Sequence, residues 1–376
     1  MARTRLRRPG VGVAWSTRRE PWPTCTGPPW SADRMRILHL LASPFYSGPA
    51  ENVALLAQAQ RAAGHDVTVA VDRRRKEVLA EEPAAPRFEE LGLLDEGGLE
   101  LSVKSPPWRM WRDLRRLKAR TVDVVHSHFS HDHLLARWGR PSGAVLVRSL
   151  HAPRSLRSSL PAADAYTVPA SALLPRLLEK GATAQVLPAL VDARFQPAPD
   201  ARSLRAELGL EGTPVIGMVS TFQPSRRHAV GVDAFALYRK QRPEARLVLV
   251  GDGGLLEQTR KQVQDLGLAD AVTFAGYQQG DAFARWLRAL DEVWLLGLGN
   301  DWSARAAAQA RACGVRVVAV DEGALPDLTD VRVERPTPDA VVAAALSDQR
   351  APVRHPTNEQ IAAEVLALYA RARRTP

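Results

Sequence analysis

Two loops of this chain carry residues whose types suit phosphate binding. Gly48 lies in the loop PFYSGP, between a predicted strand and a predicted helix. Because glycine has no Cβ, a phosphate could approach the backbone N–H groups there. Arg226 lies in the polar loop STFQPSRR, and a guanidinium can hold phosphate through two hydrogen bonds. Helix N-termini and Arg bind such an anion without a metal ion. A plain turn at Gly48 and a solvated charge at Arg226 are the simpler alternatives.

The run HSHFSHDH, from His126 to His133, suggests a different chemistry. His126 and His128 end a predicted strand, and His131 and Asp132 open a helix, so a zinc site is geometrically possible. The run resembles the HxHxDH motif of metallo-β-lactamase-like hydrolases, although its two halves lie further apart. A two-metal site would also need the remaining, scattered histidines. A zinc hydrolase and a cleft lined by metal-free histidines are the two alternatives.

The residues from Val215 to Leu328 alternate between short apolar strands and amphipathic helices. Strands separated by helices of about ten to fifteen residues predict βαβ units and a parallel sheet. Ligands of such sheets bind beyond the carboxyl ends of the strands. The predicted strands are VIGMV, ARLVLV, VTFAGY, EVWLL and VRVVAV, and the predicted helices include Val230 to Arg242, Asp281 to Leu290 and Ala304 to Cys313.

The first half of the chain, from Met35, shows the same order of elements. Its predicted strands are RILHLLAS, DVTVAV, LELSV, VDVVHSH, AVLVRSL, ADAYTVP and AQVLPAL. Its predicted helices are Ala50 to Ala63, a basic helix from Trp108, a helix between VDVVHSH and AVLVRSL, and Ala172 to Lys180. The prolines and polar residues of VDARFQPAPDARS indicate a linker. We therefore expect a leader (1–34), an N-terminal domain (35–198), a C-terminal domain (199–350), and a last segment (351–376) whose helix docks back on the N-terminal domain.

Composition bounds these expectations. A chain of 376 residues with 45% apolar residues can form about two cored domains, and a 24% charged fraction is that of an ordinary globular protein. Cys25 and Cys313 are too few for a disulfide framework, and no apolar run approaches the roughly 18 residues of a spanning helix. Half of the net charge of +10 comes from the leader, which has seven Arg against Glu20 and Asp33. A mis-called start codon, a basic arm and a disordered tail are the alternatives for it.

Several segments together resemble the GT-B glycosyltransferases of family 4. They are LLASPFYSGPAENVALLAQAQRAAGHDVTVAV, LVLVGDGG, VTFAGY and ARACGVRVVAVDEGALPDL, and the resemblance covers roughly residues 35 to 375. It implies an α/β fold of two Rossmann-like doubly wound domains that face each other across a cleft. It also implies a retaining, metal-independent transfer from a nucleotide-diphosphate sugar, with no cofactor. The lack of a convincing Asp-x-Asp motif agrees with metal independence.

The same resemblance places the diphosphate. Gly48, with Pro49, Ala50 and Glu51, matches the glycine loop GGAE of the family. The family pattern GRLxPEKG aligns Arg226 with its Lys, whereas Thr221 stands where the Arg would be. One positive charge of the family's pair is therefore missing.

The stretch GNDWSARAAAQARACG resembles the family's Glu-x7-Glu element. The resemblance implies that Asp301 contacts the donor sugar, that the loop and Arg305 meet phosphate, and that Gln309 takes the place of the Glu that holds the ribose. A glutamine accepts a hydroxyl hydrogen bond more weakly than a carboxylate does. Trp302 replaces a glycine, where close backbone approach is expected. These departures leave open a non-catalytic member of the family that binds a partner.

Three further residues complete the predicted site. His151 follows the strand AVLVRSL, at the position of a histidine that orients the donor sugar near the reacting carbon in the family. A satisfied strand-end histidine is the alternative. Gly276 and Tyr277 fall at the turn that frames the nucleotide base, although Tyr277 could instead pack between helices. His151 and Asp301 are thus the predicted catalytic residues.

The segment PPWRMWRDLRRLKAR predicts an amphipathic helix. Trp111, Leu114 and Leu117 share one face and are expected in the core. The cations of the other face, with residues 73–76, could adsorb to anionic lipid, or they could form a solvated helix face. Nucleic-acid binding is not expected, because no recognition module accompanies the patch.

The function expected from the sequence is therefore a glycosyltransferase that acts on a glycan or lipid-linked acceptor in surface polysaccharide or lipopolysaccharide assembly. We expect it in the cytoplasm or on the inner face of the plasma membrane. The two alternatives are a non-catalytic partner protein and the zinc hydrolase.

Overall fold

The structure, a computed structural model, describes residues 34–73, 82–102, 105–156, 160–298, 302–350 and 355–374. The predicted leader up to residue 33, residues 74–76 of the basic patch, and Asp301 lie outside these ranges.

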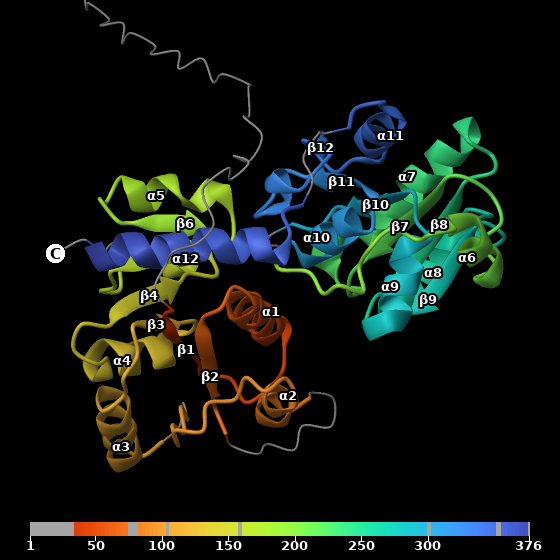
Figure 1. The fold of residues 1–376 in the computed structure, drawn as a ribbon. Helices are drawn as coiled ribbons and strands as arrows, with labels where there is room; N and C mark the ends of the chain where they lie inside the picture. Colours follow the sequence, from red (N-terminus) through yellow and green to blue (C-terminus); the bar gives the residue numbers. More distant parts are fainter. Residues whose placement is uncertain are drawn as a thin grey trace, which may run out of the picture. The chain divides into compact units, whose positions relative to one another are not determined.

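The first half of the described chain forms a six-stranded parallel sheet with the order β2-β1-β3-β4-β5-β6 (Figure 1). Most of its strand residues are buried, as expected for a parallel sheet covered on both faces. The strands are β1 (Arg36–Leu41), β2 (Asp66–Val71), β3 (Val124–Ser127), β4 (Val145–Ser149), β5 (Ala165–Val168) and β6 (Ala184–Val186). The helices are α1 (Gly48–Ala62), α2 (Ala84–Glu90), α3 (Pro107–Lys118), α4 (Ser130–Gly139) and α5 (Pro175–Leu178), with 3₁₀ turns η1 (Pro153–Ser155) and η2 (Ser171–Leu173).

The second half forms another six-stranded parallel sheet, with the order β12-β11-β10-β7-β8-β9. This is the doubly wound order, and the chain reverses direction across the sheet between β7 and β10. The strands are β7 (Val215–Val219), β8 (Arg246–Val250), β9 (Val272–Gly276), β10 (Glu292–Leu295), β11 (Arg316–Val320) and β12 (Val331–Val333). The helices are α6 (Ala201–Glu207), α7 (His228–Gln241), α8 (Leu256–Asp265), α9 (Gly280–Arg288), α10 (Arg305–Ala312) and α11 (Pro338–Leu346), with 3₁₀ turns η3 (Pro224–Arg226) and η4 (Leu325–Asp327). The prediction of an α/β fold with two doubly wound domains is confirmed.

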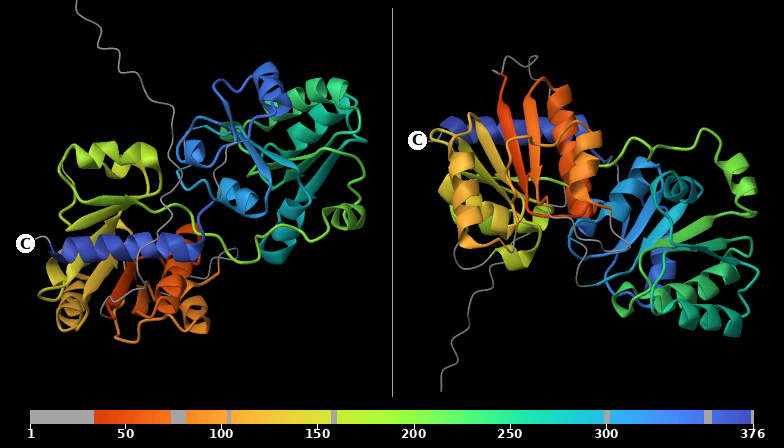
Figure 2. Two further views of the ribbon diagram at one scale, coloured as in Figure 1. Left: turned by 45° about the horizontal axis from the view of Figure 1, so that its top comes forward. Right: turned by 90° about the horizontal axis from the view of Figure 1, so that it is seen from below.

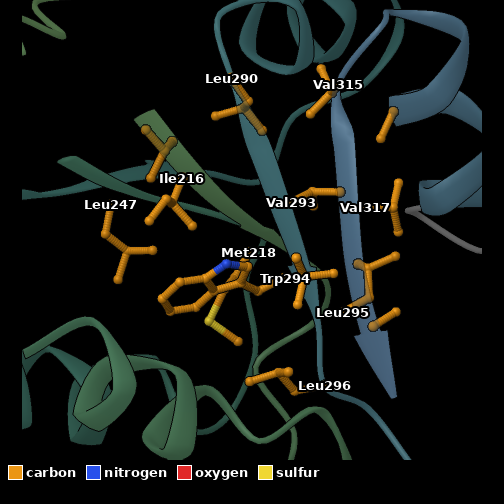
Figure 3. Packing of buried hydrophobic residues seen from close by; sticks show 14 of the residues in the cluster. Ile216, Met218, Leu247, Leu290, Val293, Trp294, Leu295, Leu296, Val315 and Val317 are labelled. Atoms are coloured by element: carbon orange, nitrogen blue, oxygen red, sulfur yellow. The ribbon is translucent and has the colours of Figure 1, made fainter. Parts of the chain in front are cut away.

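The core of the second half packs around Trp294 on β10, whose side chain is buried among Met218 and Leu247 and the neighbouring aliphatic residues (Figure 3). Gly217 on β7 leaves room for this packing, because a Cβ there would lie 2.3 Å from Leu290 Cδ1. The close fit holds β7 and β10 together at the point where the sheet order reverses.

The last helix, α12 (Asn358–Arg374), belongs to the core of the first half although it ends the chain. It contacts α1 and strands β4, β5 and β6, and Figure 2 shows it in dark blue beside the elements of the first half. Val365, Leu368 and Tyr369 are fully buried there. Because α12 supplies part of this core, the first half depends on the chain's end for its packing.

Three local expectations are wrong. The segment LELSV forms no strand over its described residues, because the Asp113 carboxylate accepts the backbone N–H groups of Glu100 and Leu101, and Leu101 has a φ of 47°. The expected helix from 172 to 180 is instead a 3₁₀ turn followed by the short α5. Trp111 is 59% exposed, since the buried stripe of α3 runs through Asp113 and Leu117.

Among the described helices, none combines the length and the apolar composition that crossing a membrane requires.

Candidate functional site

A cavity of about 320 Å³ lies where the ends of β4 and β5 meet the N-termini of α1 and α10. It is lined by Ser149, His151 and Thr167 at strand ends, by Gly48 at the start of α1, and by Trp302 and Arg305 at the start of α10. The position beyond the carboxyl ends of the strands is where doubly wound sheets bind ligands. The structure therefore brings together three residues predicted from sequence: Gly48, His151 and Arg305.

His151 directly follows the loop residue after β4, and burial lowers the pKa of its ring to about 4, with the Arg148 charge acting in the same direction. The ring is therefore neutral at physiological pH. The backbone carbonyl of His128 accepts a hydrogen bond from it, while Nε2 is buried and has no hydrogen-bond partner among the described residues. Nδ1 is thus the donor, so the buried Nε2 of this cavity-lining residue carries a free lone pair. It is suited to accept a hydrogen bond from a hydroxyl group.

Gly48 and Arg305 approach each other closely. Gly48 begins α1, with Pro49 next to it, which favours a helix start. A Cβ on Gly48 would lie 2.6 Å from Arg305 Nη1, so only glycine leaves the guanidinium its present place. Arg305 begins α10, and its Nη2 donates to the carboxylate of Glu51, in the first turn of α1. Two helix N-termini and a guanidinium therefore meet at one point, which is a suitable arrangement for a diphosphate.

Trp302 lies at the position where the sequence comparison expected a glycine. Its side chain lines the cavity and packs against the core of the second half and against the cluster of Leu150, Tyr166 and Val168 in the first half. The indole thus forms one wall of the cavity and a contact between the two halves.

Arg226 lies outside the cavity, at the end of η3. A Cβ on Gly297, after β10, would lie 3.2 Å from its Nη1, and the Leu298 N–H donates to the Ser225 carbonyl at 3.0 Å. The loops after β7 and β10 therefore touch at the point where the strand order of the second sheet reverses. Ligands of doubly wound sheets bind at that point.

The other predicted donor residues are also not part of the described cavity lining. Gln309 is buried on α10, one turn beyond Arg305 and on the same face. Thr221 is exposed in the loop after β7. Gly276 ends β9 with a φ of 70°, and Tyr277 is 68% exposed, so the alternative that Tyr277 packs between helices is wrong.

A buried hydrogen-bond network connects the sheet of the first half to the cavity. His39 bonds His128 at 3.0 Å and Gln60 at 2.8 Å, and Gln60 donates to the Tyr369 hydroxyl at 3.2 Å. The network continues from Tyr369 to His126 at 2.7 Å, then to Ser149 and Thr167 at 2.8 Å each. All its contacts are satisfied when the three imidazoles are neutral, with His39 and His126 donating from Nε2 and accepting at Nδ1.

Burial favours the neutral form of most of the chain's nine histidines. It lowers the pKa values of eight of them: His39, His65, His126, His128, His133, His151, His228 and His355. His39 and His151 are brought to about 4.

The predicted zinc motif is not assembled by the described residues. His126 and His128 lie with His39, and the ring nitrogens of these three come within 4.8 Å of one another. A metal ion there would displace the hydrogen bonds that His39 and His126 already accept at Nδ1. Asp132 instead accepts the backbone N–H groups of Ala42 and Phe129 at 2.9 and 2.8 Å. The aspartate therefore fixes the turn between β3 and α4, and these contacts favour a structural role for the run.

Ser149 and Thr167 are among the cavity residues that were not singled out from the sequence. Both are polar residues within buried, mostly apolar strands. A hydroxyl inside a buried strand needs a hydrogen-bond partner, and this signal could have marked both positions.

Two family models match consecutive parts of the chain. Residues 46–194 match the model described as Glycosyltransferase Family 4, and residues 200–334 match Glycosyl transferases group 1. The chain belongs to the family 4 glycosyltransferases.

Curated relatives match over shorter stretches. One is the GDP-mannose-dependent alpha-(1-6)-phosphatidylinositol monomannoside mannosyltransferase of Mycolicibacterium smegmatis, 33% identical over 153 residues, which are 38% of this chain and 39% of that enzyme. Another is a D-inositol 3-phosphate glycosyltransferase of Jonesia denitrificans, 34% identical over 152 residues, which are 37% of this chain and 35% of that enzyme. The chain thus matches about two fifths of the length of these relatives.

Solved structures with the same GT-B fold match almost the whole of this chain. Anabaena Alr3699/HepE in complex with UDP and glucose has a TM-score of 0.62 at 17% identity, covering 90% of this chain and 98% of that one. A glycosyltransferase from Rickettsia africae has a TM-score of 0.68 at 14% identity, covering 91% and 100%.

Proposed function

We propose that this protein transfers a sugar from a nucleotide-diphosphate sugar to a glycan or lipid-linked acceptor. The observation that carries the proposal is the meeting of Gly48, Arg305 and two helix N-termini beside His151. As the bond between sugar and diphosphate breaks, negative charge grows on the leaving group. Arg305 and the backbone N–H groups would stabilise that charge, and Arg226 would add a second guanidinium.

His151 has the role of holding the donor sugar. Its Nε2 lone pair accepts from a sugar hydroxyl, which orients the ring relative to the diphosphate. Asp301, which lies outside the described residues, and Gln309 are proposed to contact the sugar and the ribose. Thr221, Gly276 and Tyr277 are proposed to lie near the nucleotide.

The proposal includes retention of the anomeric configuration and independence of metal ions. Retention is inferred from family membership. Metal independence is supported by the Arg305 guanidinium and the two helix N-termini at the cavity, which can take the place of a divalent ion.

The acceptor is proposed to be a glycan or a lipid-linked sugar, in surface polysaccharide or lipopolysaccharide assembly. The Mycolicibacterium relative, named for a phosphatidylinositol monomannoside, supports a lipid-linked acceptor. Cytoplasmic location is part of the same proposal.

The test is a calorimetric titration of the full chain with UDP, GDP and ADP in the presence of EDTA. Both uracil and guanine belong in the panel because the relatives include a UDP complex and a GDP-mannose-dependent enzyme. We expect micromolar binding of one nucleotide, weakened about tenfold or more in Arg305→Ala and in Arg226→Ala. The matched control is Lys261→Ala, at an exposed pair with Asp265 on α8. Absence of binding to all three nucleotides would overturn the proposal. Retention is checked separately, from the anomeric configuration of the product by NMR.

A second candidate, a non-catalytic member of the family, is favoured by Trp302 in the cavity wall and by Gln309. Under that alternative, Gln309→Glu and Trp302→Gly restore neither nucleotide binding nor transfer. Under the proposed function, Gln309→Glu strengthens nucleotide binding, because a carboxylate accepts ribose hydroxyls better than an amide does.

A further inference from the structure

Three indoles are exposed on the neighbouring helices α3 and α4. Trp108 and Trp111 on α3 are 58% and 59% exposed, and Trp138 on α4 is 67% exposed. Leu134, one turn before Trp138, is 45% exposed. These four are most of the large hydrophobic side chains that are exposed in the described part of the chain.

The two helices form one unit. A Cβ on Gly139 of α4 would lie 3.2 Å from the Cα of Leu114 on α3, so the backbones approach closely. Below the indoles, Leu117 and Asp113 are buried, and the Asp113 carboxylate is held by the backbone of Glu100 and Leu101. The indoles are therefore presented by a firmly anchored pair of helices. We call the group of Trp108, Trp111, Leu134 and Trp138, with Arg115 and Arg137, the indole surface.

Each indole carries a guanidinium on its ring. Arg109 lies 5.0 Å from the ring centre of Trp108, Arg115 lies 4.7 Å from that of Trp111, and Arg137 lies 5.4 Å from that of Trp138. α3 carries five basic residues and one acid, the buried Asp113. The surface thus combines aromatic rings with an excess of positive charge.

This combination fits an anionic lipid bilayer. Indoles settle at the level of the lipid headgroups, where the ring is half apolar and the N–H finds an acceptor. Guanidinium groups beside them bind the lipid phosphates. A nucleic acid fits less well, because its bases would have to stack on ring faces that guanidinium groups already cover.

We propose that the indole surface adsorbs to anionic phospholipid membranes. This inference does not rest on the proposed transfer reaction, since none of its residues lines the cavity and the ligand is different. It is consistent with the lipid-facing patch expected from the sequence. It differs in two ways: Trp111, which was expected in the core, is part of the proposed membrane contact, and α4 contributes residues to that contact.

The experiment is co-sedimentation of the full chain with vesicles of phosphatidylcholine alone or with 30 mol% phosphatidylglycerol, at about 0.1 M salt. We expect binding to the anionic vesicles only. The triple variant Trp108→Ser/Trp111→Ser/Trp138→Ser and the pair Arg115→Glu/Arg137→Glu should each bind about tenfold or more weakly. The control pair Lys261→Glu/Arg285→Glu removes as much positive charge from other helices and should bind almost as the unchanged chain does.

The basic residues 1–34 are present in every protein compared, so the difference between variants reports the indole surface alone. Brominated lipids should quench part of the tryptophan fluorescence, and the triple variant should lose that part. Because the substituted side chains are exposed, thermal unfolding should stay unchanged, and single Trp138→Ser gives an independent second measurement. Equal binding by the triple variant, or self-association of the unchanged chain that the triple variant abolishes without any vesicle binding, would overturn the proposal.

Discussion

The replacement Gly48→Ala tests the close approach of α1 and α10. The new Cβ would lie 2.6 Å from Arg305 Nη1. To reach an ordinary van der Waals separation, the guanidinium has to withdraw by roughly 1 Å. A charge-assisted hydrogen bond of about 2.8 Å that is lengthened by that amount is lost. The replacement therefore removes the contribution of Arg305 without changing Arg305 itself.

The magnitude follows from the value of one such bond. A hydrogen bond to a charged group contributes about 1.5–3 kcal/mol. With a tenfold change in affinity for each 1.4 kcal/mol, nucleotide diphosphate binding should weaken roughly 10- to 100-fold. Folding stability should not fall, because alanine is neutral or stabilising by up to about 1 kcal/mol in place of a helical glycine. A loss of binding in a protein of unchanged stability is the expected signature.

The assay is calorimetric titration with the nucleotide that the unchanged chain binds, together with urea unfolding of each variant. A double-mutant cycle identifies the cause. In the Arg305→Ala background, Gly48→Ala should change affinity by less than about threefold, because the group it displaces is already absent. If the full loss persists in that background, the Cβ acts on the ligand or the backbone directly and the reasoning through Arg305 is wrong.

Three further results are expected. Glu51→Gln should strengthen nucleotide binding by up to about fivefold, since it releases Arg305 from a partly exposed ion pair that contributes about 0.2–1 kcal/mol; weaker binding in the titration would contradict a competing role for Glu51. Tyr369→Phe should lower the free energy of unfolding in urea by about 1–3 kcal/mol, because the ring nitrogen of His126 loses its buried partner; an unchanged midpoint would show that the network contributes little. The free energy of unfolding should rise from pH 4.5 to pH 6.5 and level off above pH 7, since the unfolded chain binds protons at the eight histidines whose pKa values are lowered by burial in the folded state. A flat profile over that window would contradict this linkage.

The sign of the pH effect depends on the balance between two kinds of buried group. A buried histidine with a pKa of about 4 in the folded protein contributes stability above pH 6.5, the pKa it has in the unfolded chain. This contribution is lost as the pH falls from 6.5 towards 4. Carboxyl groups with raised pKa values act in the opposite direction, and they are half as many: Asp113, Asp132, Glu292 and Glu364. Histidines therefore decide the slope.

The strands and long helices could be predicted because one local property decides them. β1, β8 and β11 are runs of apolar, mostly branched residues bounded by polar or glycine positions. Such runs are typical of strands that are buried on both faces, as the strands of a parallel sheet are. The errors fall where side chains reach the backbone across the chain, as when Asp113 holds Leu101 in a left-handed conformation instead of a strand. Periodicity carries no signal of such a contact.

The helix α3 shows the limit of an angular argument. Trp111 lies within about 120° of Leu117 on the helix, close enough to count as the same face by spacing alone. The buried stripe is narrower, because α4 packs through Gly139 against Leu114 and leaves the neighbouring position in solvent. Which edge of an apolar stripe is covered depends on the partner helix, and the sequence of α3 does not contain that information.

The candidate site also has a part that could be predicted from the sequence and a part that could not. Gly48, His151 and Arg305 could each be proposed from a local motif. Their meeting at one cavity could not, because it depends on contacts between distant parts of the chain, such as that between Glu51 and Arg305, which are 254 residues apart. Trp302 is the most instructive case, since the family motif has a glycine there and predicts that a large side chain would keep the ligand away from the backbone. In the structure the indole packs into clusters of both halves and lines the same cavity as Gly48 and Arg305. A bulky residue at this position can therefore stabilise the approach of the two halves while the anion is held from the α1 side. If so, Trp302→Gly should weaken nucleotide binding in the same titration, although it restores the residue type of the family motif.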